Sequence, residues 1–366
     1  MLVKEDYAME ILTLGEKIKR RRKEQKMTLK DLAGDRITPG QISLVESGRS
    51  NPSMDLLEYL ANALQTSVEY LMESEETQAE KICIYYEQSA ETYILNEDYI
   101  SAEEHIENAL FYAEKYKLEY RKAKNLFLRA NICNAKNELV LAQQLYLSAN
   151  VIFIKRNNFE QIIKTFLNLG KIALSLKAYH SAISYLKQAE KVYLYNDIGN
   201  DSLLGEIYYE MAESYFKIDD TNKSLEYTFL AKQKFEQVQD RREYGKSLIS
   251  LSKEYNKKGD IANAIKYSKK SLEVYKELET EKNVSSIENN LGKLFFEFDN
   301  IEEAFKHYNT AKQIRMRSND KDVVETMLNI CEGYIKIKEI EKCEKVLEEI
   351  RSLIDETNIE QVIEQN

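Results

Sequence analysis

Residues 28–54 read TLKDLAGDRITPGQISLVESGRSNPSM, and local signals within them place the starts of several helices. Thr28 followed by Asp31, and Thr38 followed by Gln41, have the spacing of a capping box. In that motif a threonine oxygen and a polar side chain three residues on satisfy the free N–H groups of a helix start. Two short helices are therefore predicted to begin just after Thr28 and Thr38.

Further signals extend this pattern in both directions. Pro39 suits the first position of a helix because its ring fixes φ in the helical range, and Gly48 is a helix stop. Ser53, after the Asn51-Pro52 loop, is the N-cap of the next helix. Five short helices are predicted, at residues 14–25, 29–33, 39–47, 54–63 and 68–72, the last capped by Thr66 or Ser67.

The second and third of these helices have a helix-turn-helix plan, in which the second helix enters the major groove of DNA. Ile42 and Val45 lie three residues apart and are predicted to face the core. Leu44 on the outer arc can contact a thymine methyl but gives no bidentate hydrogen bond, so phosphate contacts are expected to carry more of the affinity. The predicted DNA-binding residues are Thr28, Thr38, Pro39, Gly40, Gln41, Ser43, Leu44, Arg49, Arg20 and Arg21.

The run ISLVESG at 42–48, followed by Asn51-Pro52-Ser53-Met54, resembles the Xre/Cro-type helix-turn-helix. The resemblance covers about 58 residues, from Leu14 to Leu71. Two features depart from it: the turn before Ile42 is one residue shorter than in many members, and Leu44 stands where a basic or polar residue is frequent.

Charge separates this head from the rest of the chain. Residues 15–49 carry ten Lys/Arg and five Asp/Glu, a balance of +5 in a chain whose net charge is −10. A basic head on an acidic body suggests a polyanionic partner, although a solvated helix face also explains a basic run alone. Salt-dependent affinity is expected from Arg49 and from the cluster 20–22.

The whole chain is predicted to be all-α. Its only two prolines lie before residue 53, and 43% of all residues are hydrophobic, which is enough to fold. A β-rich chain of this length would need more turn-forming residues. No apolar window suits a transmembrane span, and the N-terminus has no apolar segment typical of a signal peptide. A cytoplasmic protein is expected.

Small residues recur with a spacing of about 40 from residue 83 onward, in seven units that start near 83, 123, 163, 205, 245, 285 and 324. The first small position of each unit holds Ala90, Ala130, Gly170, Ala212, Ser252, Gly292 and Cys331, and the residue three further on is usually aromatic. Two more small positions hold Ala102, Ala142, Ala182, Ser224, Ala264, Ala304 and Cys343, then Ala109, Ala149, Ala189, Ala231, Ser271, Ala311 and Ile350. Small side chains at a fixed phase allow two helices to cross closely.

This pattern resembles tetratricopeptide architecture with lengthened loops. The resemblance implies a right-handed superhelix of about seven repeats with a concave inner face. The predicted domains are a DNA-binding domain at 1–72, an acidic linker at 73–82 for which a helix is one interpretation, and a repeat domain for peptide binding and dimerisation at 83–366.

In such an array one face of each first helix points into the concave channel. The residues predicted to bind a peptide there are Asn131, Lys164, Asn168, Lys171, Tyr209, Glu210, Glu213, Lys253, Asn290 and Asn329. An amide can both accept from and donate to an extended backbone, and the charged groups suit peptide termini or side chains. Asn and Lys are also common on solvated helix faces, and the sequence leaves both interpretations open.

Other chemistry has no motif to support it. Three histidines fall in three repeats and are expected at the surface rather than at a metal. Cys331 and Cys343 occupy packing positions of one repeat, so proximity is expected and redox chemistry is not. No phosphate loop, catalytic triad or metal motif is present, and neither enzyme activity nor a cofactor is predicted.

An Xre-type head on a tetratricopeptide body resembles the peptide-pheromone-controlled regulators of Gram-positive bacteria, the Rap, Rgg, NprR, PlcR and PrgX (RRNPP) group, and most closely PlcR- and NprR-like members. The resemblance implies quorum sensing by a homodimeric transcription factor that binds operator DNA and a short signalling peptide. Two alternatives stay open: an NprR/Rap-like protein whose array binds a phosphorelay response regulator, and a dimeric regulator that needs no peptide.

Overall fold

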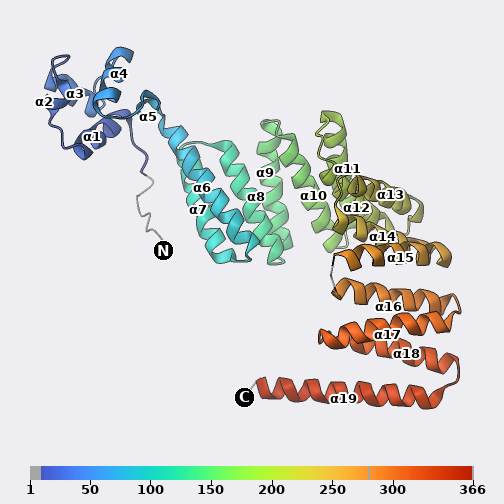
Figure 1. The fold of residues 1–366 in the computed structure, drawn as a ribbon. Helices are drawn as coiled ribbons and strands as arrows, with labels where there is room; N and C mark the ends of the chain where they lie inside the picture. The colour runs from blue at the N-terminus through green and yellow to red at the C-terminus, as the bar shows by residue number, and fades with distance from the viewer. Residues whose placement is uncertain (1–9, 279–280, 365–366) are drawn as a thin grey trace. The chain divides into compact units, whose positions relative to one another are not determined.

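The computed structural model describes residues 10–278 and 281–364, with the side chains beyond 354 left aside. Within these residues the chain forms nineteen helices and no strand, which confirms the all-α prediction (Figure 1). The chain divides into two compact units, Met1–Thr165 and Phe166–Asn366. Each unit is described by itself.

The head of the first unit contains the five predicted helices, with bounds within two residues of the expected ones. They are α1 Leu14–Glu24, α2 Leu29–Ala33, α3 Pro39–Glu46, α4 Met54–Ala63 and α5 Val68–Met72. The capping boxes at Thr28 and Thr38 are both formed, and Ser53 and Ser67 cap α4 and α5. A third capping box, formed by Thr13 and Glu16 at α1, was not predicted.

The head has its own apolar core. Ile18, Leu32, Ile42 and Leu60 are fully buried, and Val45 is nearly so, which confirms the inward face predicted for α3. Burial of these side chains on five short helices holds the head together, because helices of 5–11 residues are marginal in water without tertiary packing.

A glycine sets the distance between α1 and α3. A Cβ atom on Gly15 would lie 2.6 Å from the carbonyl oxygens of Val45 and Glu46. Only glycine permits this approach, and the sequence analysis did not identify it. The end of α3 is also tied to α1 by Arg22, whose Nε and Nη2 donate to the two carboxylate oxygens of Glu46 at 2.6 and 2.9 Å.

The head is joined to the first repeat helix by buried polar contacts. The Nζ of Lys17, fully buried, donates to the carbonyl oxygens of Tyr70 and Glu73 at 2.8 and 2.7 Å. Gln78 bonds both the N–H and the carbonyl of Leu12, at 3.0 and 2.9 Å. The Lys17 bonds tie α1 to the end of α5, and the Gln78 bonds tie the residue before α1 to the start of α6, which runs over Glu75–Leu95.

Most of the segment expected as a linker, 73–82, therefore belongs to a packed helix. Ala79 is fully buried and Ile82 nearly so. The boundaries 1–72 and 83–366 stay predictions.

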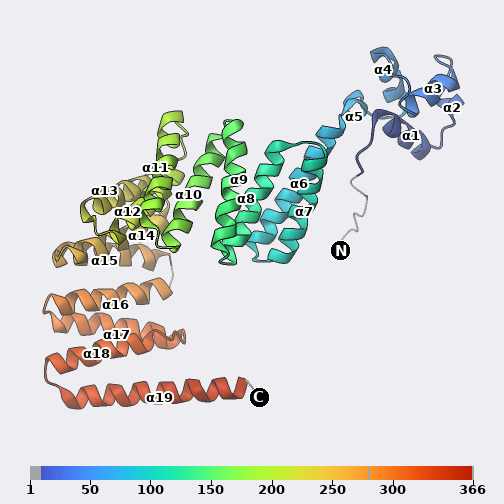
Figure 2. The same ribbon diagram turned by 180° about the vertical axis from the view of Figure 1, so that it is seen from behind.

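Seven helix pairs follow one another along the chain, as predicted. The first unit holds α6 with α7 Tyr99–Lys115, α8 Glu119–Ala135 with α9 Leu139–Lys155, and the start of α10 Phe159–Ser175. The second unit continues through α11 Tyr179–Asn196, α12 Asp201–Lys217, α13 Thr221–Gln237, α14 Arg241–Lys257, α15 Ile261–Glu277, α16 Glu281–Glu297, α17 Ile301–Arg317, α18 Val323–Lys336 and α19 Ile340–Glu364. Consecutive helices of α16–α19 lie side by side in both views (Figures 1 and 2).

The repeat phase predicted from the small residues is confirmed, since the residues at all three small positions are buried. A Cβ atom on Gly170 would lie 2.7 Å from the Leu186 side chain, and one on Gly292 would lie 2.4 Å from the Tyr308 ring. The Cys331 Sγ lies 3.9 Å from the Cys343 carbonyl oxygen, which confirms their proximity.

A second periodicity, between rings twelve residues apart, was missed. Rings stack nearly parallel at Tyr215–Tyr227, Tyr255–Tyr267 and Phe295–His307, with centroids 5.2–5.6 Å apart. The first ring follows the small residue of one helix by three positions, and the second does the same on the next helix. His307 is therefore half-buried, as is His105 beside Tyr93, and the expectation of surface histidines was wrong for both.

Candidate DNA-binding and ligand-binding sites

The N-terminal end of α3 presents the predicted recognition residues together. Thr38, Pro39, Gly40, Gln41, Ser43 and Leu44 are all exposed. The Gln41 Oε1 accepts from the Thr38 N–H at 2.9 Å, which fixes the side chain. Its Nε2 has no partner among the described residues and is free to donate to a base or a phosphate. Leu44 is 45% exposed and gives this face an apolar contact.

Thr28 is exposed at the start of α2, but its polar groups are already used. Its Oγ1 donates to the Asp31 carboxylate at 2.7 Å and its N–H donates to the same oxygen at 2.8 Å. These two bonds hold the pKa of Asp31 below its ordinary value. The carboxylate therefore stays charged beside the helix start, which opposes a phosphate at Thr28.

The arginines of the head differ in what they already bind. Arg22 is tied to Glu46 and to the Met27 carbonyl, so its guanidinium is structural and not available to phosphate. Arg20 pairs with Glu10 at the surface. Arg21 pairs with Glu24 at 3.1 Å and also lies over the Tyr70 ring.

Arg49 is different, because it is exposed and no described residue holds its guanidinium. It follows directly after α3, close to the recognition residues. Arg49 is thus the arginine best placed for a phosphate contact.

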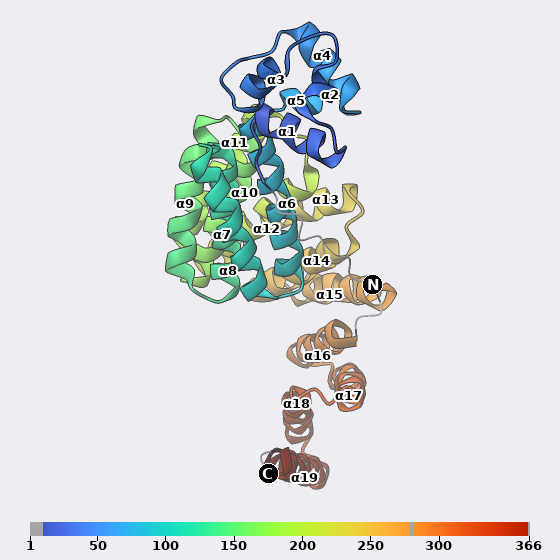
Figure 3. The same ribbon diagram turned by 90° about the vertical axis from the view of Figure 1, so that its left-hand side faces the viewer.

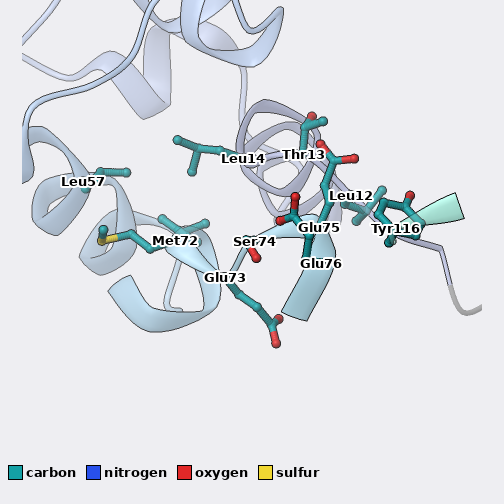
Figure 4. Close-up of a pocket in the computed structure, with 11 residues that line it drawn as sticks. Leu12, Thr13, Leu14, Leu57, Met72, Glu73, Ser74, Glu75, Glu76 and Tyr116 are labelled. Atoms are coloured by element: carbon teal, nitrogen blue, oxygen red, sulfur yellow. The ribbon is translucent and has the colours of Figure 1, made fainter. Parts of the chain in front are cut away.

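A cavity of about 470 Å³ lies where the head meets α6 (Figure 4). Leu12, Leu14, Leu57 and Met72 give it apolar walls. Glu73, Glu75 and Glu76, with Ser74, Thr13, Leu71 and Tyr116, complete it. The sequence carries no signal for this cavity, because its walls come from four separate segments.

Two of the predicted peptide-binding residues lie in the first unit. Asn131, half-buried on α8, accepts a hydrogen bond from the Tyr146 hydroxyl at 2.5 Å. Lys164 on α10 pairs with Glu160 one turn earlier at 2.6 Å. Each is therefore already engaged by a neighbour.

A buried charge cluster nearby was not predicted. The Arg121 guanidinium donates to Glu87 at 3.0 Å and to Glu80 at 3.0 and 3.1 Å. Asn125 donates to the other Glu87 oxygen at 2.8 Å. The cluster joins α6 to α8, and its charges are paired with one another, so it is a structural contact.

The second unit brings three of the predicted residues, Lys171, Glu210 and Glu213, into one polar cluster. Lys171 on α10 donates to Glu206 at 3.1 Å and lies 4.0 Å from Glu210. Glu213, one turn beyond Glu210 on α12, accepts from the Ser250 hydroxyl of α14 at 3.0 Å.

Burial has raised the pKa of the Glu210 carboxyl to about 7, with a further contribution from nearby carboxylates and an opposing one from Lys171. Burial also raises the pKa of the Tyr209 hydroxyl. Asn168 lies half-buried one turn before Lys171 on α10. This cluster suits a ligand that carries a cationic or hydrogen-bond-donating group.

Lys253 and Asn290 line a shallow cavity of about 150 Å³ between α14 and α16. Lys293 also lines it, and the rest of the wall is Ile249, Ser252, Asn256, Ser268, Ile287, Leu294 and Glu297. Ammonium, amide and apolar groups are thus placed together in the second unit. Asn256, which contributes a further amide, was not identified from the sequence.

Asn329 does not share this environment. It is 9% exposed, and its Nδ2 donates to the Asn289 Oδ1 at 3.0 Å. The pair connects α16 to α18, so the Asn329 amide is already used in the interior. Its place in the repeat had suggested a third amide of the channel, but its bond to Asn289 holds it in the interior.

No helix in the described part of the chain is both long and apolar enough to cross a membrane. The described residues also contain no group of three or more His, Cys, Asp or Glu side chains arranged to hold a metal ion. All four cysteines are buried and free, and burial raises the pKa of the Cys83 thiol to about 12. The thiol stays protonated and unreactive at neutral pH.

Family models match both parts of the chain. Residues 18–71 match the model described as helix-turn-helix, and residues 255–317 match the model described as tetratricopeptide repeat. The protein joins a helix-turn-helix domain to a tetratricopeptide array. Both domain predictions from the sequence are thereby confirmed.

Solved structures with this fold include RapI and the quorum sensor NprR. The apo form of RapI is 16% identical, with 75% of this chain and 77% of that chain covered and a TM-score of 0.58. The apo form of the quorum sensor NprR from B. thuringiensis is 14% identical, with 75% and 76% covered and a TM-score of 0.51. A STAND protein with a tetratricopeptide repeat sensor from Pyrococcus horikoshii is 16% identical, with 86% and 49% covered and a TM-score of 0.61.

One curated relative, Protein KINESIN LIGHT CHAIN-RELATED 2 of Arabidopsis thaliana, is 22% identical over 194 residues. The match covers 52% of this chain but only 29% of that protein, so the chain spans less than a third of its relative's length. At these identities the likenesses establish the fold. The order of a helix-turn-helix domain and a tetratricopeptide array is consistent with a regulator of the RRNPP type.

Proposed function

We propose that this protein is a DNA-binding transcriptional regulator of the RRNPP type whose tetratricopeptide array binds a short signalling peptide. Binding of the peptide changes the geometry of a homodimer and so changes its affinity for operator DNA. The observation that carries the proposal is a recognition helix with a free amide and a free neighbouring arginine, in the same chain as an array with polar, partly desolvated sites.

The DNA-binding part rests on the chemistry at α3. Gln41 offers an exposed amide donor, Leu44 an apolar contact and Arg49 a free guanidinium. An amide reads base edges, an apolar side chain contacts a thymine methyl, and a guanidinium binds phosphate. The phosphate contact positions the protein on the DNA, and the amide and apolar contacts read the base sequence with few base-specific hydrogen bonds.

The peptide-binding part rests on the second unit. Lys253, Asn290 and Lys293 surround a cavity of about 150 Å³, which is the size of a side chain rather than of a drug-like ligand. The cluster of Lys171, Glu210 and Glu213 adds groups of both charges. An extended peptide uses several such small sites in succession, through backbone amides and a few anchored side chains.

The head is also suited to respond to the array. Gln78 attaches Leu12, just before α1, to α6 through two hydrogen bonds of 3.0 and 2.9 Å, and Lys17 attaches α1 to the end of α5 through two of 2.8 and 2.7 Å. A displacement of α6 therefore carries the recognition helix with it, because no flexible linker separates them. In a dimer, a change in the spacing of two recognition helices alters the fit to half-sites about one helical turn apart.

The proposal is tested by selecting duplexes from a random library with the full chain and then measuring binding by gel shift. Gln41→Ala and Arg49→Ala are expected to weaken binding to the selected duplex. Lys23→Ala, a change on the exposed face of α1, is the matched control. Short peptides encoded beside the gene are then titrated calorimetrically, with Lys253→Ala/Asn290→Ala as the paired variant.

Loss of duplex binding in the α3 variants together with loss of peptide binding in the array variant supports both halves of the proposal. DNA binding without any peptide binding favours a regulator that needs no peptide. Binding of a response regulator in place of peptide, followed by loss of its phosphate, favours the NprR/Rap-like alternative.

A further inference from the structure

The residue directly after the third small position of a repeat faces the repeat that follows. This position holds Leu110, Asn150, Glu190, Lys232, Leu272 and Lys312 in successive repeats. The Lys232 Nζ lies 5.6 Å from the centre of the Tyr244 ring on α14, and the Lys312 Nζ lies 2.7 Å from the Glu349 carboxylate on α19. Glu190 on α11 has the same place in its repeat, so it faces α12 and α13. Helix α12 packs against both α11 and α13 within the second unit (Figure 3).

Glu190 reverses the charge of this position and lacks a partner for it. Lys232 pairs with Glu236 at 3.2 Å, and Lys312 pairs with Glu349. The Glu190 carboxylate is half-buried, yet no hydrogen bond or ion pair reaches it from the described part of the chain. Withdrawing a carboxylate from water without giving it a partner costs free energy. The carboxylate therefore gains from a cation that another molecule supplies.

The charged groups nearest to Glu190 do not satisfy it. Burial raises the pKa of its carboxyl, Lys187 one turn earlier on α11 opposes this effect, and Glu226 on α13 adds to it. Lys187 is exposed and forms no ion pair with Glu190. Lys191 is exposed as well, and its long side chain can keep the ammonium in water. Neither lysine replaces the water that Glu190 has lost.

Two tyrosine hydroxyls beside Glu190 are also without partners. Tyr208 on α12 is buried and Tyr227 on α13 is half-buried, and neither hydroxyl has a hydrogen-bond partner among the described residues. Burial, followed by the charge of Glu190, raises the pKa of both hydroxyls, so both lie close to the carboxylate. Their ring centroids are 5.8 Å apart, and the Tyr227 ring stacks on Tyr215. Three polar groups from three helices thus converge with unused capacity for hydrogen bonds.

Glu190 also borders an open hollow in the surface of the second unit. The hollow has a volume of about 520 Å³ and is lined by Glu190, Lys191, Leu194 and Tyr195. Leu194 and Tyr195 are 59 and 87% exposed. Apolar and aromatic side chains around a partly desolvated charge are typical of the centre of a protein–protein interface. A site for a free ion has no need of them.

We propose that the hollow beside Glu190 binds an arginine side chain on the surface of a partner protein. The planar guanidinium donates two hydrogen bonds to the Glu190 carboxylate, which a lysine ammonium cannot do in the same geometry. The hydroxyl oxygens of Tyr208 and Tyr227 accept from the remaining N–H groups. Leu194 and the exposed Tyr195 ring contact the apolar surface around the arginine, and the ring face also attracts the cation.

This interaction surface goes beyond the proposed function. It lies on α11, a second helix of its pair, whereas the residues predicted to bind the signalling peptide lie on first helices. It is also separate from α3 in the head. DNA binding and peptide binding can therefore be measured independently of it.

The experiment places a fluorescent reporter in the hollow of the full chain. The protein contains no tryptophan, so Tyr195→Trp gives a single tryptophan that reports on this site alone. The probes are the peptide acetyl-Gly-Leu-Arg-Leu-Gly-amide and the same peptide with citrulline, the neutral analogue of arginine, at its centre. Both are titrated at constant ionic strength, because the arginine peptide is charged. A saturable change in fluorescence is expected at millimolar arginine peptide, with affinity for the citrulline peptide lower by about fivefold or more.

Three variants in the Tyr195→Trp chain test the assigned contacts. Glu190→Gln keeps the shape of the side chain and is expected to lower the affinity for the arginine peptide to that for the citrulline peptide. Tyr208→Phe/Tyr227→Phe keeps both rings and is expected to lower it by about two- to threefold. The matched control is Glu236→Gln, which removes one exposed carboxylate from the neighbouring helix α13 and is expected to leave both affinities unchanged.

Equal affinity for the two peptides, or no change in fluorescence with either, would overturn the arginine site. An unchanged preference for arginine in Glu190→Gln would also overturn it, as would an equal loss in Glu236→Gln, because the effect would then come from net charge. N-acetylarginine amide binding as tightly as the peptide would overturn the protein partner, since Leu194 and Tyr195 would then contribute nothing.

Discussion

The close approach of α1 to α3 makes Gly15 the most sensitive position of the helix-turn-helix domain. In Gly15→Ala the new Cβ would lie 2.6 Å from two backbone carbonyl oxygens, and ordinary contacts of this kind exceed 3.4 Å. The oxygens belong to helix backbone and cannot rotate away, so α1 must move by several tenths of an ångström. Such overpacking costs ~1–3 kcal/mol. The gain in helix propensity from glycine to alanine, at most ~1 kcal/mol, offsets only part of it.

Gly40→Ala is the matched control, since Gly40 is likewise the second residue of its helix. A Cβ there would meet nothing nearer than the Thr38 Oγ1 at 3.9 Å. It is therefore expected to be neutral or slightly stabilising. The assay is hydrogen exchange by mass spectrometry on the full chain, which reports the free energy of opening for peptides that span α1 and α3.

Gly15→Ala is expected to lower the opening free energy of α1 and α3 by ~1–2 kcal/mol while peptides from the array exchange as in wild type. Protection equal to or greater than that of wild type would refute the close packing of α1 on α3. A loss of similar size in Gly40→Ala would also refute it, because the effect would then come from removing glycine at a helix start.

Three other predictions follow from single positions. Gly170→Leu should cost about 1–3 kcal/mol in chemical unfolding, because a Cβ there already lies 2.7 Å from Leu186; a silent change would show that the repeat phase is wrong. Burial raises the pKa of Glu254 to about 7, so the folded state binds a proton that the unfolded state, with a pKa near 4.5, releases. The stability that this bound proton gives the folded state is therefore present below pH 4.5 and lost as the pH rises through about 7. Glu254→Gln should reduce the fall in stability between pH 5 and 8 by about 1–3 kcal/mol, and thermal melts with parallel pH profiles would contradict this. Arg49→Ala should lower the slope of log K against log salt for DNA binding by about one unit, and an unchanged slope would remove Arg49 from the phosphate contacts.

The protonation state of Glu254 depends on where the Ser224 hydroxyl donates, because donation to the carboxyl lowers the pKa of Glu254 and opposes the effect of burial. The Ser224 hydroxyl has one proton, and it lies within reach of both the Ala212 carbonyl and the Glu254 carboxyl. If Ser224 donates to the carbonyl, the contact with Glu254 requires a proton on the carboxyl, which then donates to the Ser224 oxygen. Glu254 is 2% exposed, so no water replaces this arrangement.

Features with a local cause were predictable from the sequence. The capping boxes at Thr28 and Thr38 depend on residues three apart, and each set the start of its helix correctly. The phase of the repeats was likewise predictable, because seven units repeat the same steric requirement for a small residue. Agreement across many positions compensates for the weak signal of any one.

Features that depend on distances between distant segments were not predictable. Gly15 looks like any glycine near a helix start in the sequence. Its role is visible only in the structure, where two carbonyl oxygens of α3 lie 2.6 Å from the position that a Cβ atom on Gly15 would take. The Gln78 bonds to Leu12 join residues 66 apart in sequence. Asn329 shares the repeat position of Asn290, yet one is buried and the other exposed, because small rotations between helices decide which face a side chain meets.

The central claim is that ligand binding in the array changes DNA binding by the head. The measurement that tests it most directly is a titration of the selected duplex with the full chain at rising concentrations of the peptide that binds it. A saturable change in duplex affinity of fivefold or more is expected, and Lys253→Ala/Asn290→Ala should abolish it without altering affinity in the absence of peptide. Equal duplex affinity at zero and saturating peptide, in a protein that demonstrably binds both, would contradict the account.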